Sequence, residues 1–95
     1  MSRKVNIAEQ VARYARCLAP EPRRAVKRAL VELREERGDI RVLEANLSGF
    51  YRLRVGRFRL IFAYLPDGTI NVLFMEDRPL VYELFEAIFI KRLKS

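Results

Sequence analysis

Histidine and tryptophan are absent from this 95-residue sequence, and cysteine occurs once. Without histidine there is no His-dependent catalytic triad, and one cysteine cannot build an internal disulfide or the usual zinc site. We therefore expect no metal and no cofactor. No uninterrupted apolar stretch approaches the ~18 residues of a membrane span, and no apolar leader follows the first residues. The expectation is a cytoplasmic protein that does not bind membranes.

Basic and aromatic side chains are plentiful instead. Nineteen Lys and Arg residues against twelve Asp and Glu residues give a formal net charge of +7, which favours a polyanionic partner such as nucleic acid. Six phenylalanines and four tyrosines, within a hydrophobic fraction of 51%, supply apolar surface for a packed core. A chain of this length has room for one core, so we expect residues 1–95 to form a single domain.

The first third of the chain has the spacing of two helices. Over residues 7–18 the apolar positions recur on one helical face, at Ile7, Val11, Tyr14, Ala15 and Leu18. Pro20 and Pro22 interrupt this pattern, a second apolar stripe follows, and Gly38 is expected to end the second helix. The short connection between the two predicts an antiparallel helical hairpin.

After residue 49 the apolar period changes to two, which predicts strands. Residues 39–49 have no clean period and are expected to be a connection. Gly56 and Arg57 mark a tight turn within residues 50–64, and Ile70–Met75 is predicted to be a third strand of an antiparallel meander. Alternate side chains of the hairpin are expected to pack on the helices: Tyr51, Leu53, Val55, Phe58, Leu60, Phe62 and Tyr64.

Asp77-Arg78-Pro79 is typical of a helix start and predicts a final helix over residues 80–93. Its apolar arc is wider than a surface helix of a small domain needs. A second copy of the chain, a partner polypeptide or deep burial is expected to cover that arc. The fold class is therefore α+β, with an N-terminal helical hairpin packed on a small antiparallel β-sheet, followed by a C-terminal helix.

Arginines gather on the other face of the predicted hairpin. A turn at Gly56 and Arg57 places Arg54 opposite Arg59, a like-charge pair that destabilises a sheet by roughly 0.2–1 kcal/mol. An anion between the two would reverse that cost, because guanidinium groups bind phosphate oxygens in a bidentate way. Arg52 lies on the same face and Arg78 follows the third strand. The pattern predicts a phosphate site, with a solvated basic face as the alternative.

The sequence LSGFYRLRVGRFRLIF (residues 47–62), together with Asp77-Arg78 and Val81-Tyr82, resembles the RelE/ParE superfamily of type II toxin-antitoxin toxins. The resemblance extends from about Ile7 to Leu93 and is most specific in the arginine hairpin. It implies a helical hairpin, a small antiparallel sheet and a C-terminal helix. Members usually have a strand before the helical hairpin, and in this chain only residues 3–7 are available to form it.

The resemblance also implies an activity. RelE-type members cleave messenger RNA in the ribosomal decoding site without a metal, by attack of a 2′-hydroxyl on the adjacent phosphate, and a cognate antitoxin silences them. The implied active-site residues are Arg54, Arg59, Arg78 and Tyr82, as catalytic residues, and Arg52, as an RNA-binding residue. Phe50, which the hairpin register puts on the arginine face, and Arg57 in the turn are further RNA-binding candidates. Arg59 and Arg78 are expected to stabilise charge on the phosphorane and Arg52 to orient the RNA backbone.

Three functions stay open at this point. The complete arginine and tyrosine set favours a ribosome-dependent endoribonuclease, an mRNA interferase that inhibits translation, over a ParE-like inhibitor of DNA gyrase. Arginine is a poor general base, so a catalytically inactive RNA- or antitoxin-binding relative is the third possibility. Tyr82 is either the base or a platform that stacks on a nucleobase. Expected partners are a cognate antitoxin, the ribosome and mRNA, in a homodimer or a toxin-antitoxin heterotetramer.

Overall fold

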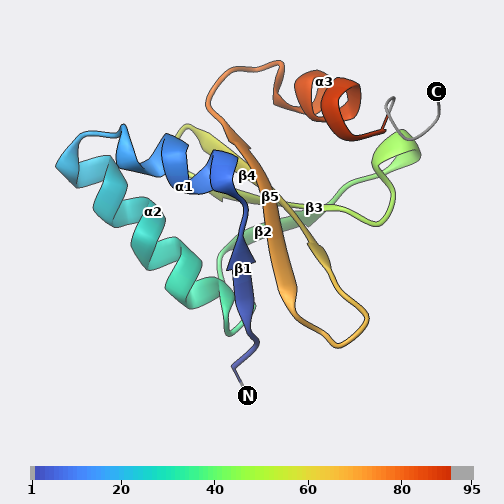
Figure 1. The fold of residues 1–95 in the computed structure, drawn as a ribbon, viewed down its shortest axis with the longest axis horizontal. Helices are drawn as coiled ribbons and strands as arrows, with labels where there is room; N and C mark the ends of the chain where they lie inside the picture. The colour runs from blue at the N-terminus through green and yellow to red at the C-terminus, as the bar shows by residue number, and fades with distance from the viewer. Residues whose placement is uncertain (1, 91–95) are drawn as a thin grey trace.

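A computed structural model describes residues 2–90 and places three helices beside and above one twisted sheet (Figure 1). Two short segments, η1 and η2, are a 3-10 turn and a π-helical turn. The elements are, in chain order, β1 (Val5–Ile7), α1 (Glu9–Arg16), α2 (Pro20–Leu33), β2 (Asp39–Val42), η1 (Ala45–Leu47), β3 (Tyr51–Val55), β4 (Phe58–Tyr64), β5 (Ile70–Glu76), α3 (Val81–Phe85) and η2 (Glu86–Ile90).

The sheet has the strand order β1-β5-β4-β3-β2. Strands β2 to β5 form an antiparallel meander, and β1 adds to the β5 edge in parallel. The predicted α+β class and the hairpin register are confirmed: Arg54 lies opposite Arg59 and Leu53 opposite Leu60 across β3 and β4. Within residues 2–90, no helix is long and apolar enough to span a membrane.

Three sequence-based expectations about element boundaries are wrong. The second helix ends at Leu33 and not at Gly38, and a turn follows it. Residues 39–49 are not a plain connection, because Asp39–Val42 pairs with β3 along its whole length and η1 follows. The alternation in this four-residue strand is too short to stand out before its partner is known. The first helix begins at Glu9 rather than at residue 7, since Ile7 belongs to β1 and is aligned with Val72 of β5.

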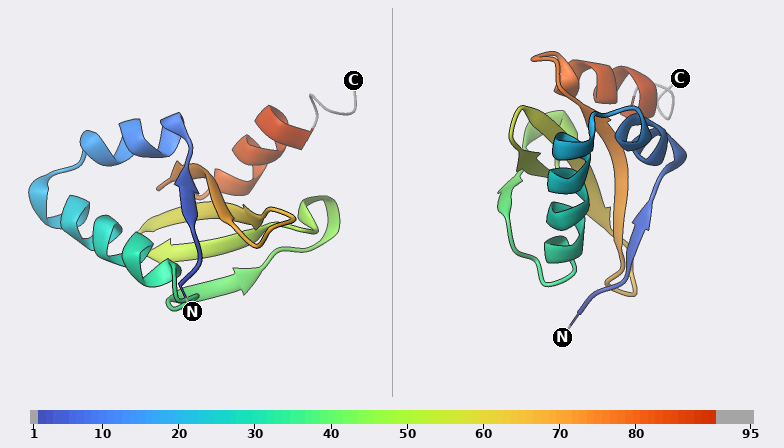
Figure 2. Two further views of the ribbon diagram at one scale, coloured as in Figure 1. Left: turned by 60° about the horizontal axis from the view of Figure 1, so that its bottom comes forward. Right: turned by 90° about the vertical axis from the view of Figure 1, so that its left-hand side faces the viewer.

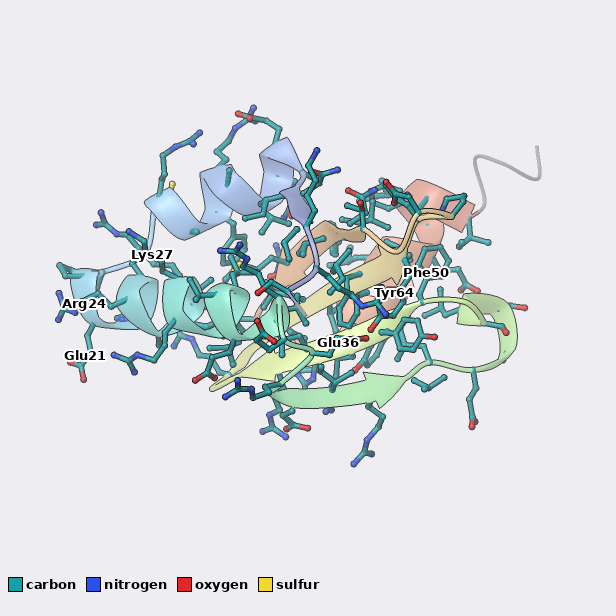
Figure 3. All side chains as sticks on the ribbon, turned by 90° about the horizontal axis from the view of Figure 1, so that it is seen from below. Glu21, Arg24, Lys27, Glu36, Phe50 and Tyr64 are labelled. Atoms are coloured by element: carbon teal, nitrogen blue, oxygen red, sulfur yellow. The ribbon has the colours of Figure 1, made fainter. Side chains whose placement is uncertain are left out.

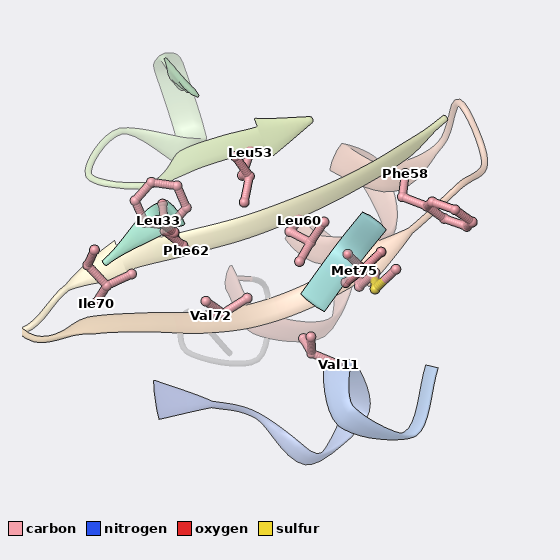
Figure 4. Packing of buried hydrophobic residues seen from close by; sticks show 10 residues of the cluster. Val11, Leu33, Leu53, Phe58, Leu60, Phe62, Ile70, Val72 and Met75 are labelled. Atoms are coloured by element: carbon pink, nitrogen blue, oxygen red, sulfur yellow. The ribbon is translucent and has the colours of Figure 1, made fainter. Parts of the chain in front are cut away.

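Each face of the sheet has its own apolar cluster. The larger cluster joins the α1–α2 hairpin to the face that carries Leu53, Leu60 and Phe62, as predicted from the alternation (Figure 4). The smaller cluster lies on the opposite face and joins Ile61 and Phe74 to α3. Figure 2 shows α3 apart from the α1–α2 hairpin. The strands are therefore held from both sides, and this fixes the direction of every side chain between them.

Only one side of the last helix packs against the sheet. Val81 and Phe85 are fully buried against the sheet, whereas Leu80 and Ile88 remain 57% and 42% exposed. Regular α-helix ends at Phe85 and a π-helical turn follows to Ile90. The remainder of the predicted 80–93 helix, from residue 91 onward, lies outside the described residues. The wide apolar arc is thus buried on one side and exposed on the other.

Candidate active site

Four charged residues form a row across the sheet on the face opposite the α1–α2 hairpin. The row runs from Asp39 on β2 through Arg54 on β3 and Arg59 on β4 to Glu76 on β5, each aligned with its neighbour. The two central arginines repel each other, but each has a carboxylate on its outer side. Neither carboxylate forms an ion pair with a central arginine among residues 2–90, because Asp39 bonds Arg52 and Glu76 bonds Arg78, so their charges reduce the repulsion only by lying nearby.

The two central arginines are the accessible cations of the row. Arg54 is exposed, and its Nε donates a hydrogen bond of 3.2 Å to the carbonyl of Gly56 in the β3–β4 turn. Arg59 is half-buried and makes no ion pair or side-chain hydrogen bond among residues 2–90. Two arginines aligned across β3 and β4 thus keep free donors on one face, as the binding of an anion with several oxygens requires.

Arg52 is in a different environment from the other arginines. It is 7% exposed, and its Nη2 lies 2.7 Å from Oδ1 of Asp39. Its buried Nε has no hydrogen-bond partner within the described part of the chain. Arg52 faces the same side as Arg54, as predicted, but its guanidinium is held by a carboxylate of its own chain.

Arg41 of β2 is a cation that sequence analysis missed. It is exposed and aligned with Arg52, so it lies on the arginine face. The sequence pattern predicted a connection over residues 39–49, and the side-chain direction of a residue in a connection cannot be predicted. The alternation of Asp39, Ile40, Arg41 and Val42 is the signal that was available.

Arg57 and Arg78 flank the end of the row nearest β5. The Nε of Arg78 lies 3.2 Å from Oε1 of Glu76, and the Nε of Arg57 lies 3.5 Å from Oδ2 of Asp77. Arg57 also lies over the ring of Phe58, 5.2 Å from its centroid. Arg78 keeps 69% of its side-chain surface exposed, so it is oriented by Glu76 without being covered.

Tyr82 and Phe50 belong to the α3 side of the site. Phe50 packs edge-on against Phe85 with ring centroids 5.0 Å apart, and both Phe50 and Tyr82 are half-buried in the smaller apolar cluster (Figure 3 labels Phe50). Tyr82 lines a cavity of about 190 Å³ together with Glu44, Ala45, Asn46, Leu47, Glu83 and Glu86. The cations expected around its hydroxyl are not among these lining residues.

The charges of α2 are separate from this site. Figure 3 shows Glu21, Arg24 and Lys27 pointing outward at the far end of that helix. All three are exposed. Among residues 2–90 there is no group of three or more Cys, Asp or Glu side chains arranged to hold a metal ion.

Comparisons with known proteins identify solved structures that have the same fold. No protein-family model and no curated protein sequence matches the chain. The structure does match the RelBE2 toxin-antitoxin complex from Mycobacterium tuberculosis, with a TM-score of 0.70 and 24% identity over 82% of this chain and 100% of that one. The chain has the RelE fold.

Two further structures support the RelE fold. The archaeal RelE-RelB complex from Pyrococcus horikoshii matches with a TM-score of 0.63 and 27% identity, over 83% of this chain and 98% of that one. A mutant of E. coli toxin RelE in the free state matches with a TM-score of 0.66 and 21% identity, over 98% and 99%. The RelE resemblance inferred from the arginine hairpin is therefore confirmed for the fold.

Proposed function

We propose that this chain is the toxin of a type II toxin-antitoxin system and acts as a ribosome-dependent, metal-independent mRNA endonuclease in the cytoplasm. The observation that carries the proposal is the pair of accessible guanidinium groups of Arg54 and Arg59, side by side on a RelE fold, with Arg78 at the adjoining end of β5. Solved relatives with this fold are toxins, two of them in complexes with their antitoxins.

The reaction proposed for the site is a transesterification within RNA. The 2′-oxygen gives up its proton and attacks the adjacent phosphorus, negative charge grows on the non-bridging oxygens, and the bond from phosphorus to the 5′-oxygen of the next nucleotide breaks. That 5′-oxygen takes up a proton, and a 2′,3′-cyclic phosphate remains on the other fragment. In this proposal Arg59 and Arg78 stabilise the negative charge, and Arg54 adds a third cation. Preorganised cations suit this role because they need no proton transfer of their own.

Proton transfer in the proposed reaction involves Tyr82 or a group of the ribosome. Tyr82 either accepts the proton of the 2′-hydroxyl or stacks on a base, and Tyr82→Phe distinguishes the two roles. If the Tyr82 hydroxyl is the general base, its removal lowers the cleavage rate and changes the pH profile of cleavage. If the ring stacks on a nucleobase, phenylalanine keeps the ring and the cleavage rate is retained. Arg52 would contact RNA only after Asp39 releases it, so Arg41 and Phe50 are the more accessible RNA-binding candidates on this face.

A cognate antitoxin is the proposed partner that silences the chain, as the toxin-antitoxin complexes among the relatives suggest. The exposed apolar side chains Leu80 and Ile88 beside the arginine face are a candidate contact for such a partner. We propose a heterotetramer or a homodimer of the toxin as the assembled form, to be measured by light scattering of the chain with and without its antitoxin.

Expression of the chain alone in bacteria tests the proposed activity. We expect growth arrest with cleavage of translated messages, and we expect Arg59→Ala and Arg78→Ala each to lower cleavage by about 10²–10³-fold, as loss of one preorganised donor does. Arg24→Ala, an exposed residue at the far end of α2, is the matched control and should stay toxic. Folding of each variant is checked by circular dichroism.

The alternatives predict different results in the same experiment. A ParE-like gyrase inhibitor would leave messages intact while blocking DNA supercoiling. A catalytically inactive relative would bind RNA without cleaving it on ribosomes. Undiminished mRNA cleavage in both folded arginine variants would overturn the assignment of the site.

A further inference from the structure

A second polar cluster lies just behind the β5 end of the arginine row and involves α1. Strand β1 pairs with β5 only as far as Val72, so beyond that residue no strand of the described residues 2–90 lies beside the outer edge of β5. Gln10 of α1 takes the place of the missing strand. Its side-chain amide donates to the Met75 carbonyl at 2.8 Å and accepts from the Met75 N–H at 2.9 Å.

One helical turn after Gln10, Tyr14 reaches the two residues that follow Met75. Its hydroxyl donates to Oδ1 of Asp77 at 2.9 Å and lies 3.5 Å from Oε1 of Glu76. The Glu76 side chain is 7% exposed, and the same oxygen accepts from the Asp77 N–H at 3.1 Å and from Arg78. A single hydroxyl on α1 thus contacts both carboxylates that orient arginines of the site.

These contacts connect α1 to two arginines at the end of the sheet, Arg57 in the β3–β4 turn and Arg78 after β5. Glu76 holds Arg78, and Asp77 lies 3.5 Å from Arg57. The ring of Tyr14 packs edge-on against Phe58 with centroids 6.1 Å apart, so the body of the side chain belongs to the larger apolar core. Only its hydroxyl extends to the carboxylates.

We propose that Tyr14 is a positioning residue of the arginine site, which sets the orientation of Arg57 and Arg78 through Asp77 and Glu76. The inference rests on the proposed function for its effect on cleavage, and on the contacts alone for its effect on the arginines. Two adjacent carboxylates repel each other, and the neutral hydroxyl, which donates to Asp77 and lies near Glu76, offsets part of that repulsion. Burial of Tyr14 and its bond to Asp77 raise the tyrosine pKa to about 12, so the donor keeps its proton near neutral pH.

The variant Tyr14→Phe removes the hydroxyl and keeps the ring that packs on Phe58. Tyr64→Phe is a matched control because the Tyr64 hydroxyl also donates to a carboxylate, at 2.6 Å to Glu36, and its pKa is likewise raised to about 12 (Figure 3). Glu36 contacts Arg3 near the amino end rather than any arginine of the row. A purely structural role of the hydroxyl of a half-buried tyrosine would affect both variants alike.

The first measurement follows the Nε–Hε signals of Arg57 and Arg78 by ¹⁵N NMR of the full chain. We expect both signals to shift and exchange faster with water in Tyr14→Phe and to stay unchanged in Tyr64→Phe. This readout needs no cleavage activity, so it tests the positioning role even where the proposed function fails. Unchanged arginine signals in Tyr14→Phe would overturn the proposal.

The second measurement is single-turnover mRNA cleavage on programmed ribosomes. We expect Tyr14→Phe to lower the cleavage rate about 10-fold while ribosome binding is retained, because a small displacement of a catalytic group reduces rate rather than affinity. Tyr64→Phe should cleave at the wild-type rate. Equal rates in the two variants would contradict a positioning role, whereas absence of cleavage by the unaltered chain would instead contradict the proposed function.

Discussion

At the residue scale, Arg52 shows how one guanidinium can be structural while its neighbours are accessible. It is buried on the sheet and bonded to Asp39 at 2.7 Å, and its Nε has no hydrogen-bond partner among residues 2–90. Removing one partner of such a pair leaves a buried charge, which costs more than the pair itself contributes. The ion pair therefore ties β2 to β3 and is expected to stabilise the edge of the sheet.

This argument predicts that Asp39→Asn destabilises the fold by about 1–3 kcal/mol, measured as the free energy of unfolding in urea. The double variant Arg52→Leu with Asp39→Asn should recover part of the loss, because it leaves no buried charge without a partner. Equal stability of Asp39→Asn and the unaltered chain would show that Arg52 does not depend on Asp39.

Two tyrosines give the fold a predictable response to alkali. Burial and a bond to a carboxylate raise the pKa of Tyr14 and of Tyr64 from 10.0 to about 12. A group whose pKa is higher in the folded state contributes stability that is complete below its unfolded pKa and is lost as the pH rises toward the folded one. Stability should therefore fall between about pH 10 and 12.

Acid should act through different groups. The bond from Tyr14 lowers the pKa of Asp77, and the bonds from Tyr64 and Arg3 lower that of Glu36, so their contributions are present above about pH 4 and are lost below it. Melting temperatures measured as a function of pH at constant salt test both the alkaline and the acid loss of stability. The double variant Tyr14→Phe with Tyr64→Phe should lose most of the alkaline decline, and an unchanged decline would count against this explanation.

At the element scale, the joint between α2 and β2 depends on Gly38. Its φ of +131° lies in the left-handed region, and a Cβ there would approach Cδ1 of Leu53 to 2.9 Å. Leu53 is a fully buried residue of β3, so the added atom would press on the larger core. Because Gly38 has no side chain, the backbone can pass close to Leu53, and β2 begins at the next residue and pairs with β3.

Gly38→Ala is expected to destabilise the fold more than Gly49→Ala does. Both glycines have positive φ, +131° and +96°, but a Cβ at Gly49 meets nothing within 4 Å. Strain of the backbone costs roughly 1–3 kcal/mol at either site, and the contact with Leu53 adds to it at Gly38 alone. Urea unfolding of the two variants provides the comparison, and equal losses would show that the contact has no cost.

At the scale of the whole molecule, the formal net charge of +7 predicts attraction to RNA that weakens with salt. If Arg54, Arg59 and Arg78 each neutralise a phosphate, the logarithm of the binding constant for a short single strand should fall with the logarithm of salt concentration with a slope of about −2. Fluorescence anisotropy measures this slope. Arg54→Ala should reduce its magnitude, and a slope near zero would exclude phosphate contacts as the source of affinity.

Much of the arginine hairpin could be predicted from sequence because its information is local. The period of two in residues 51–64 and the turn at Gly56 fix which residues pair and which face they share. The arginine face, the apolar face and the RelE resemblance all followed from those few residues. All the assigned roles stay predictions: the catalytic roles of Arg54, Arg59, Arg78 and Tyr82, and the RNA-binding roles of Arg52, Phe50 and Arg57.

Edges and ends of the fold were less predictable. Strands β1 and β2 have three and four residues, and each becomes a strand only by pairing with a segment far away in the chain. The missed position of Arg41 follows directly from this, since a side chain acquires a direction only when its strand is paired.

By itself, the sequence determined the two helices, the hairpin register, the excess of positive charge and the family resemblance, because short-range spacing and composition encode them. Only the tertiary structure decided which arginines remain accessible. Asp39 and Glu76 reach the row from strands β2 and β5, and Tyr14 reaches its end from α1. Charge compensation depends on distances between segments remote in the chain, and those distances exist only after folding.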